Sequence, residues 1–236
     1  MEKNFIIEIR KNLQKAASAK SAKIQKRFFK GEVKLYGVKS VEIEKIAKKC
    51  LGEIKKWPKE KVFSICEKLW QSDYLEEELI ACRFCYSKHK DFKPTDFKIF
   101  EGWINKYIKN WASCDTFCNH SVGDFLQMYP KYSAKLKIWA RAKNLWLRRA
   151  AAVSLIVPVK KGLFLNDIFA IADILLKDKE DMVQKGYGWM LKVASQAHQE
   201  KVFKYIMKNK QLMPRTALRY AIEKMPANLR QKAMEK

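Results

Sequence analysis

Apolar side chains recur along this chain at helical spacing almost from end to end. Glycine and proline are few, at 8 and 6 residues, and no long stretch alternates β-branched residues with turn signals as strands would. The pattern predicts one or two helices over residues 1–30, and further helices over 41–56, 59–71, 74–88, 95–108, 111–128, 131–142, 145–157, 163–176, 179–195, 198–209 and 214–225. We therefore expect an all-α protein.

Polar and special residues mark several of the boundaries between these helices. Two glycines and several aromatic residues predict a packed connecting loop near residues 28–40. Ser40 is expected to cap the next helix, with Glu42 in its first turn. Asp178 is a second expected cap, and Pro214 falls where a first-turn proline is tolerated.

The helices are joined by short turns, which favours antiparallel pairs. Pairs that recur every ~35–45 residues predict an α-solenoid of HEAT-like units with a concave face. The repeat concerns architecture alone, because no sequence motif is repeated. We expect one HEAT-like domain over residues 1–236, with a compact helical bundle as the alternative fold.

The net charge of the chain indicates what kind of partner it binds. The chain has 49 Lys and Arg against 25 Asp and Glu, a formal charge of +24. Residues 125–166 contain no acidic side chain. Such an imbalance favours a polyanionic partner, with nucleic acid ahead of an anionic membrane surface. Basic residues on successive helices could line a groove that follows a phosphate backbone, although a solvated lysine surface is the plainer reading.

Several classes of protein are disfavoured by composition. Hydrophobic content of 48% with 12% aromatics excludes global disorder. No run approaches the ~18 apolar residues of a membrane span, and the N-terminal residues do not resemble a signal peptide. The six cysteines are therefore expected to be reduced thiols in a cytoplasmic protein.

The segment from Trp111 to Phe125 carries the densest potential chemistry. On a helix, Trp111 and Asp115 lie on one face, and Cys114, Cys118 and Val122 lie on a neighbouring face that suits burial. Asp115 and Asp124 are nine residues apart, about half a turn out of phase on a straight helix. They are therefore not expected to be a paired general acid and base.

Other tryptophans differ in their surroundings. Trp189 has Lys185 four residues before it and Lys192 three residues after it, an arrangement suited to gripping nucleic acid rather than to a core. Trp146 follows Trp139 by seven residues, which is a core spacing.

The sequence gives little support for a metal site or for a nucleophilic catalytic residue. Cys82 and Cys85 form a CxxC that could join Cys114, Cys118 and His120 in a zinc site. The CxxC falls within a predicted helix, however, so buried thiols are the simpler reading and no metal is expected. Cys118 and His120, two residues apart on a helix, point in different directions. No phosphate-binding loop, HExxH or GxSxG motif is present.

Several ordered segments nevertheless resemble those of the AlkD-type DNA alkylation-repair proteins, which are HEAT-like-repeat DNA glycosylases. The resemblance covers nearly the whole chain. It rests on the loop Phe29-Lys-Gly-Glu-Val-Lys-Leu-Tyr-Gly-Val38, the pair Trp111 and Asp115, Asn144-Leu-Trp-Leu-Arg-Arg149-Ala-Ala, Gln184-Lys-Gly-Tyr-Gly-Trp189-Met-Leu and Pro214-Arg-Thr-Ala-Leu-Arg219-Tyr-Ala.

The resemblance implies excision of purines alkylated at N3 or N7 from duplex DNA, without a cofactor. It places the family's catalytic aspartate on Asp115, its active-site tryptophans on Trp111 and Trp189, and its groove arginine on Arg149. The further DNA contacts that we expect are Arg148, Lys185, Lys192, Arg215 and Arg219.

Other functions remain open at this point. The residue after the first tryptophan is often acidic in the family, and here it is Ala112. Related branches lack the aspartate and bind structured DNA without excision, so a non-catalytic binder of branched or damaged DNA, or of RNA, is the alternative. A protein-interaction scaffold is disfavoured by the charge. We expect a monomer that acts on double-stranded DNA containing alkylated bases, without an obligate protein partner.

Overall fold

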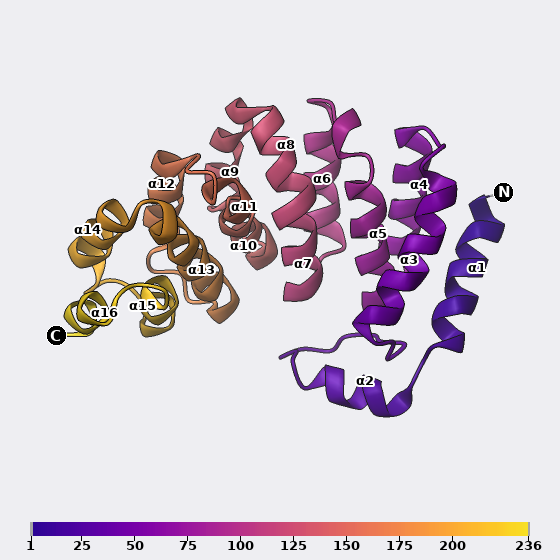
Figure 1. Ribbon diagram of the computed structural model, residues 1–236, viewed down its shortest axis with the longest axis horizontal. Helices are drawn as coiled ribbons and strands as arrows, with labels where there is room; N and C mark the ends of the chain where they lie inside the picture. Colours follow the sequence, from indigo (N-terminus) through magenta and orange to yellow (C-terminus); the bar gives the residue numbers. More distant parts are fainter. Residues whose placement is uncertain (1, 236) are drawn as a thin grey trace. The chain divides into compact units, whose positions relative to one another are not determined.

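The computed structural model describes residues 2–235, which are helical almost throughout (Figure 1). Apart from one isolated parallel bridge between Lys34 and Tyr74, the described residues form no β-structure. The expected all-α class is confirmed. The α-helices are α1 (Glu2–Lys15), α2 (Ala19–Lys26), α3 (Ser40–Ile54), α4 (Lys59–Trp70), α5 (Leu75–Tyr86), α6 (Asp96–Lys106), α7 (Trp111–Phe117), α8 (Gly123–Met128), α9 (Ser133–Trp139), α10 (Leu145–Val153), α11 (Ile156–Val159), α12 (Leu165–Leu175), α13 (Asp181–Ala197), α14 (Gln199–Asn209), α15 (Arg215–Ile222) and α16 (Ala227–Met234).

Most helices lie within a few residues of their predicted positions, and the exceptions have local causes. The 145–157 prediction is broken into α10 and α11 by a turn at Ser154 and Leu155. The last helix, α16, was not predicted, because its eight residues carry only a weak apolar stripe.

The predicted helix caps were wrong in detail. Ser40 is the first residue of α3, and Lys39 occupies the cap position. Pro214 likewise stands just before α15. Asp178 is not the cap residue of α13, because Glu180 occupies that position. The Asp178 carboxylate instead accepts a hydrogen bond from the Glu180 backbone N–H at 2.9 Å.

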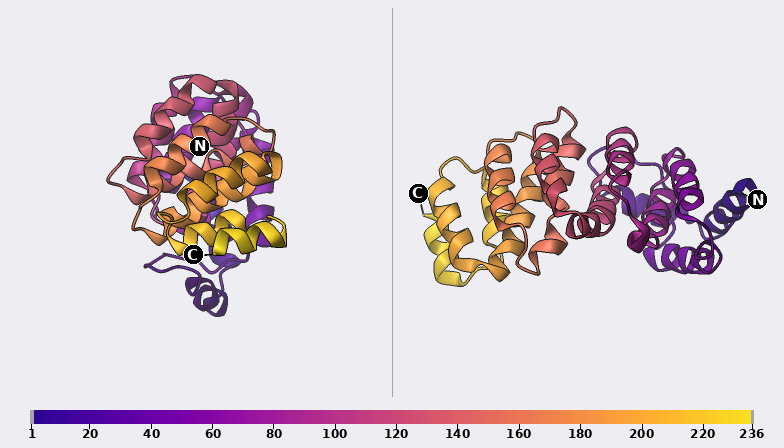
Figure 2. Two further views of the ribbon diagram at one scale, coloured as in Figure 1. Left: turned by 90° about the vertical axis from the view of Figure 1, so that its left-hand side faces the viewer. Right: turned by 90° about the horizontal axis from the view of Figure 1, so that it is seen from above.

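Two compact units make up the chain, Met1–Phe117 and Cys118–Lys236. In the first unit, α3, α5 and α7 pack in succession, and α4 packs against α1 and α5. The unit's core is rich in aromatic residues, with Trp70, Phe84, Phe100 and Phe117 all less than 2% exposed. The short helix α2 and the loop that follows it lie to one side of the unit's other helices (Figures 1 and 2).

The second unit is arranged around α13. This helix packs against α10 on one side and α15 on the other, and it also contacts α11, α12 and α14. A second row is formed by α9 against α12 and by α14 against α16. Each unit is thus built of helices paired in two rows, as expected. One domain over 1–236, and one basic groove along it, stay predictions.

No helix in the described part of the chain is both long enough and apolar enough to cross a membrane.

Candidate active site and nucleic-acid interface

The helical segment that begins at Trp111 confirms the predicted core face, whereas only Trp111 is accessible on the neighbouring face, because Asp115 is buried. Cys114, Cys118 and Val122 are all fully buried, whereas Trp111 is half-buried and Asp115 is 9% exposed. Residues Cys118–Val122 form a π-helical segment between α7 and α8. A π-helical segment changes the angular step per residue, so the straight-helix argument about Asp115 and Asp124 does not hold beyond Phe117.

The Trp111 indole is oriented by the loop that follows α2. Its Nε1 donates a hydrogen bond to the Phe28 carbonyl at 3.1 Å, and its ring stacks on Phe29 with centroids 5.6 Å apart and planes inclined by 20°. Phe28 itself is 69% exposed. An indole held at both its N–H and its face is presented in one orientation to a partner.

Glu76 and Glu77, the first two of three consecutive glutamates at the start of α5, hold this loop in place. The Glu76 carboxylate accepts hydrogen bonds from the backbone N–H groups of Tyr36, Gly37 and Val38 at 3.1, 2.8 and 3.1 Å. Gly37 has φ of 81°, and a Cβ there would lie 2.3 Å from the Ser18 carbonyl oxygen. Glycine is therefore required at this position.

Glu77, the second glutamate, binds the Tyr36 side chain of the loop and the Arg10 side chain of α1. Its carboxylate accepts from the Arg10 guanidinium at 3.0 Å and from the Tyr36 hydroxyl at 2.7 Å. The Tyr36 ring stacks on Tyr74 at 4.2 Å. Burial, followed by the hydrogen bond to Glu77, raises the pKa of the Tyr36 hydroxyl, so this hydroxyl remains a donor at neutral pH.

Glu78, the third glutamate, holds the start of the helix that carries Trp111 and Asp115. It is 2% exposed and accepts from Asn110 Nδ2 at 3.0 Å and from the Ser113 hydroxyl. Asn110 Oδ1 in turn accepts from the Ser113 backbone N–H at 2.9 Å, which caps α7. Burial raises the pKa of Glu78, and the hydrogen bonds from Ser113 and Asn110 partly oppose this shift.

Sequence reasoning missed these glutamates as supports of the site. Three acidic residues in a predicted first helical turn were a usable signal, because acidic side chains there accept from nearby N–H groups. Asn110, a good cap directly before Trp111, was a second such signal.

In the second unit, three consecutive residues fix the orientation of α13. A Cβ on Gly186 would meet Arg149 Cγ of α10 at 3.2 Å, and one on Gly188 would lie 2.7 Å from Tyr220 Cβ of α15. Between them, Tyr187 is fully buried and donates to the Leu176 carbonyl at 3.2 Å. Successive residues on a helix are ~100° apart, so Trp189 points to a fourth side, where it is half-buried.

Lys185 and Lys192, the two lysines beside Trp189 that were predicted to contact DNA, each form an ion pair with an acidic residue. Lys185 pairs with Asp181 at 2.9 Å, and Lys192 pairs with Glu223 at 3.0 Å. Partly exposed pairs of this kind contribute little stability, so either lysine could exchange its carboxylate for a phosphate.

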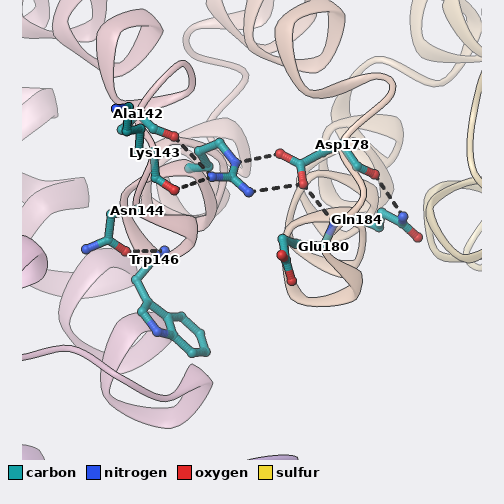
Figure 3. A network of polar contacts seen from close by, with 8 residues as sticks. Ala142, Lys143, Asn144, Trp146, Asp178, Glu180 and Gln184 are labelled. Carbon is teal, nitrogen blue, oxygen red and sulfur yellow. Dashed lines mark hydrogen bonds and ion pairs between the residues drawn. The ribbon is translucent and has the colours of Figure 1, made fainter.

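The two predicted arginines of α10 connect this helix to its neighbours. Arg148 donates to the Asp178 carboxylate at 2.6 and 3.3 Å and to the carbonyls of Ala142 and Lys143 (Figure 3). Arg149 is 5% exposed and donates to the Met182 carbonyl, just inside α13. A phosphate contact from either arginine would compete with these internal bonds.

Arg215 and Arg219, in contrast, are both exposed and lie one turn apart on α15. The second unit thus gathers the predicted residues onto α10, α13 and α15, which pack in succession. Asp115 and Trp189 belong to different units, and their meeting in one site stays a prediction. Trp139 is buried as predicted, but Trp146 is only half-buried.

None of the six cysteines forms a disulfide, and all are buried. Cys82 and Cys85 lie within α5, and burial raises the pKa of Cys82 well above its ordinary value. Among residues 2–235, no group of three or more His, Cys, Asp or Glu side chains is placed to hold a metal ion.

Comparison with known proteins identifies the family. The model of the DNA alkylation repair enzyme family matches residues 9–225. A solved structure described as a predicted DNA alkylation repair enzyme from Enterococcus faecalis superimposes with a TM-score of 0.81 at 18% identity, over 89% of this chain and 97% of that one. The structure of smu.31 from Streptococcus mutans UA159 gives a TM-score of 0.58 at 20% identity, over 94% and 98%.

No protein with a curated description matches the chain. The structural likeness confirms the expected fold, and the match of the family model extends over most of the sequence. The chain belongs to the DNA alkylation repair enzyme family.

Proposed function

We propose that this protein is a DNA glycosylase that removes cationic purines alkylated at N3 or N7, with Asp115 as its central residue. The observation that carries the proposal is the placement of Asp115 one helical turn after Trp111, on a helix whose first turn is held by Glu78 and Asn110. A carboxylate and an indole thereby lie one turn apart on one helix, in a chain whose family is named for repair of alkylated DNA.

The proposed reaction requires little acid catalysis. An alkylated purine already carries positive charge, so it leaves as a neutral base when the bond between C1′ and nitrogen breaks. Positive charge then develops on the sugar, which the Asp115 carboxylate would stabilise. Water adds to C1′, its proton passes to solvent, and an abasic site remains. Because Asp115 is 9% exposed, its charge acts with less screening by water than that of a surface carboxylate.

Trp111 and Trp189 would hold the cationic nucleotide. The electron-rich face of an indole attracts a cation, and both indoles are only half-buried. Trp111 is held by Phe28 and Phe29, so little orientational freedom would be lost on binding.

The phosphate backbone would be bound by basic residues of α10, α13 and α15. Contacts to phosphate set the position of the protein on the duplex without reading sequence, and the charge of +24 supplies the attraction. The proposed residues are Arg148, Arg149, Lys185, Lys192, Arg215 and Arg219. In this proposal the protein acts as a monomer, without a cofactor or an obligate protein partner.

The test is the release of free base from duplex DNA that contains N7-methylguanine or N3-methyladenine, with Asp115→Asn measured in parallel. We expect release by the unaltered protein and at least a hundredfold loss in the variant, about the effect of removing one stabilising group from a transition state. Release at equal rates by both proteins would remove Asp115 from the mechanism.

A second candidate is a non-catalytic protein that recognises damaged or branched DNA. The burial of Asp115 favours it, because a carboxylate with 9% exposure offers little surface to substrate and water. Tight binding of lesion-containing duplex without any base release would establish this function in place of the first.

A further inference from the structure

A pocket of about 770 Å³ opens in the first unit beside the start of α7. Its walls come from the loop after α2, from the turn before α5 and from the residues just before α7. The charged residues of these walls are Lys26, Lys30, Glu32, Lys34, Asp73, Glu78 and Lys109. The pocket contains neither Trp111 nor Asp115, although Asn110 directly precedes Trp111.

Two lysines of the pocket share one carboxylate. Lys34 and Lys109 lie 3.7 and 2.8 Å from the two oxygens of Asp73, and their side chains are 61% and 64% exposed. Asp73 has φ of 63°, a left-handed conformation that aspartate tolerates better than most residues. Two ammonium groups thus face a single negative charge, and one positive charge is left over.

Both of these lysines project from fixed backbone. The Lys34 carbonyl accepts a hydrogen bond from the Leu75 N–H at 3.0 Å, beside the bridge to Tyr74. Lys109 directly precedes Asn110, whose side chain is bound to buried Glu78. Holding the base of each side chain reduces the entropy that is lost when its ammonium group binds an anion.

The remaining charged residues of the pocket balance one another, so the excess positive charge of Lys34 and Lys109 over Asp73 is retained. Lys26 and Lys30 add two cations, against Glu32 and Glu78. A single phosphate fills only a small part of about 770 Å³, so the space suits several linked phosphate groups.

We propose that this pocket binds successive phosphodiester groups of a DNA strand that runs past Trp111, with Lys34 and Lys109 as the principal contacts. This inference rests on the proposed DNA-binding function and adds a contact region in the first unit, where no basic residue had been assigned. Inorganic phosphate shares the recognised chemistry, so the test includes it separately.

The first experiment compares two double variants that remove equal charge. Lys34→Ala with Lys109→Ala alters the pocket. Lys45→Ala with Lys49→Ala removes two lysines of α3 that are similarly exposed, at 67% and 73%, and are likewise paired with glutamates. Binding to an undamaged duplex is measured over a range of salt concentrations.

The pocket variant is expected to bind roughly 30-fold more weakly at ~0.15 M salt, and its log–log salt slope to fall by about 1.8, the effect of losing two phosphate contacts. The α3 variant should change affinity less than about threefold, because it removes no such contact. Equal losses in both variants, or no loss in the pocket variant, would overturn the proposal.

A second experiment needs no substitution. Lysine acetylation of the unaltered protein is compared without ligand, with undamaged duplex and with inorganic phosphate at the same phosphate concentration. Lys34 and Lys109 should be protected by duplex, and Lys45 and Lys49 should not. Equal protection by inorganic phosphate would make this a small-anion site, and absence of protection by duplex would refute the assignment.

The duplex is undamaged in both experiments, so neither result depends on base release. A protein that fails to excise could still show the pocket contacts, and one that excises through Asp115 could lack them. The two proposals therefore fail independently.

Discussion

The Trp111 indole donates its hydrogen bond to the carbonyl of Phe28, which lies 83 residues earlier in the chain. A candidate active-site residue on α7 is thus oriented by a loop that is itself held by Glu76 and Glu77 at the start of α5. The placement of the indole depends on contacts spread over the whole first unit.

Replacing Trp111 by phenylalanine tests this orientation. Trp111→Phe keeps an aromatic ring but removes the N–H that binds Phe28. The loss of one hydrogen bond is worth about 1 kcal/mol, so we expect base release to slow about fivefold if the bond positions the ring. The melting temperature should change little, because Trp111 is half-buried. A large loss of stability with unchanged release would show that the indole serves the fold instead.

Glu78 predicts a dependence of stability on pH. Its pKa is raised above the ordinary value of 4.5 in the folded protein, so the folded state binds this proton more tightly than the unfolded state does. The contribution to stability is greatest below pH 4.5 and is lost as pH rises through the folded pKa.

Glu78→Gln lacks this titration. The stability of the unaltered protein relative to the variant should therefore fall as pH rises from about 4 towards 7. Denaturant unfolding of both proteins at several pH values measures the difference. A difference that stays constant or grows with pH would contradict the assignment. Glu78→Ala, which leaves Asn110 and Ser113 without their acceptor, should cost about 2–4 kcal/mol near pH 4.

Gly188 makes possible the close packing of α13 on α15. In Gly188→Ala the new Cβ would lie 2.7 Å from Tyr220 Cβ and 2.8 Å from the Ala217 carbonyl, so the helices must separate. We expect a loss of about 1–3 kcal/mol in unfolding free energy.

Gly52 and Gly102 provide matched controls for this substitution. Both are within helices, and a Cβ on either would meet nothing within 4 Å. Alanine there should stabilise the protein by up to ~1 kcal/mol, because alanine is the better helix former. Thermal unfolding of the three variants separates the effect of packing from that of helix propensity; destabilisation by all three would contradict the packing argument.

Substitutions of Arg148 and Asp178 test whether Arg148 of α10 binds DNA or only stabilises the fold. Their side chains are 17% and 7% exposed, so breaking this pair from either side should cost about 3 kcal/mol. If Arg148 also contacts phosphate, Arg148→Ala should lower the salt slope of DNA binding by about 0.9. Asp178→Asn destabilises but keeps the arginine, and it should leave the slope unchanged. Equal slopes in both variants would assign Arg148 to the fold alone.

The sequence was informative where local periodicity decides the outcome. Burial of Cys114, Cys118 and Val122, with Trp111 and Trp189 outside the core, follows from helical spacing and was predicted correctly. Pairings between distant residues were not predictable in this way. Lys192 meets Glu223 31 residues later, and Arg148 meets Asp178 30 residues later. Both pairings depend on how helices pack, which spacing within one helix does not specify.

The π-helical segment Cys118–Val122 also escaped prediction. Its five residues continue the apolar pattern of an ordinary helix, and the altered hydrogen bonding leaves no signature in composition. Predictions of which side chains share a helix face therefore apply within α7, but not beyond Phe117, where the number of residues per turn changes.

Glu76, Glu77 and Glu78 occupy a single helical turn, yet they bind the loop around Gly37, helix α1 through Arg10, and the cap of α7. Unwinding of that turn would release all three at once. The first unit should therefore open cooperatively instead of fraying from its N-terminus. In native-state hydrogen exchange, the amides of Gly37 and Ser113, 76 positions apart in the sequence, should share one opening free energy.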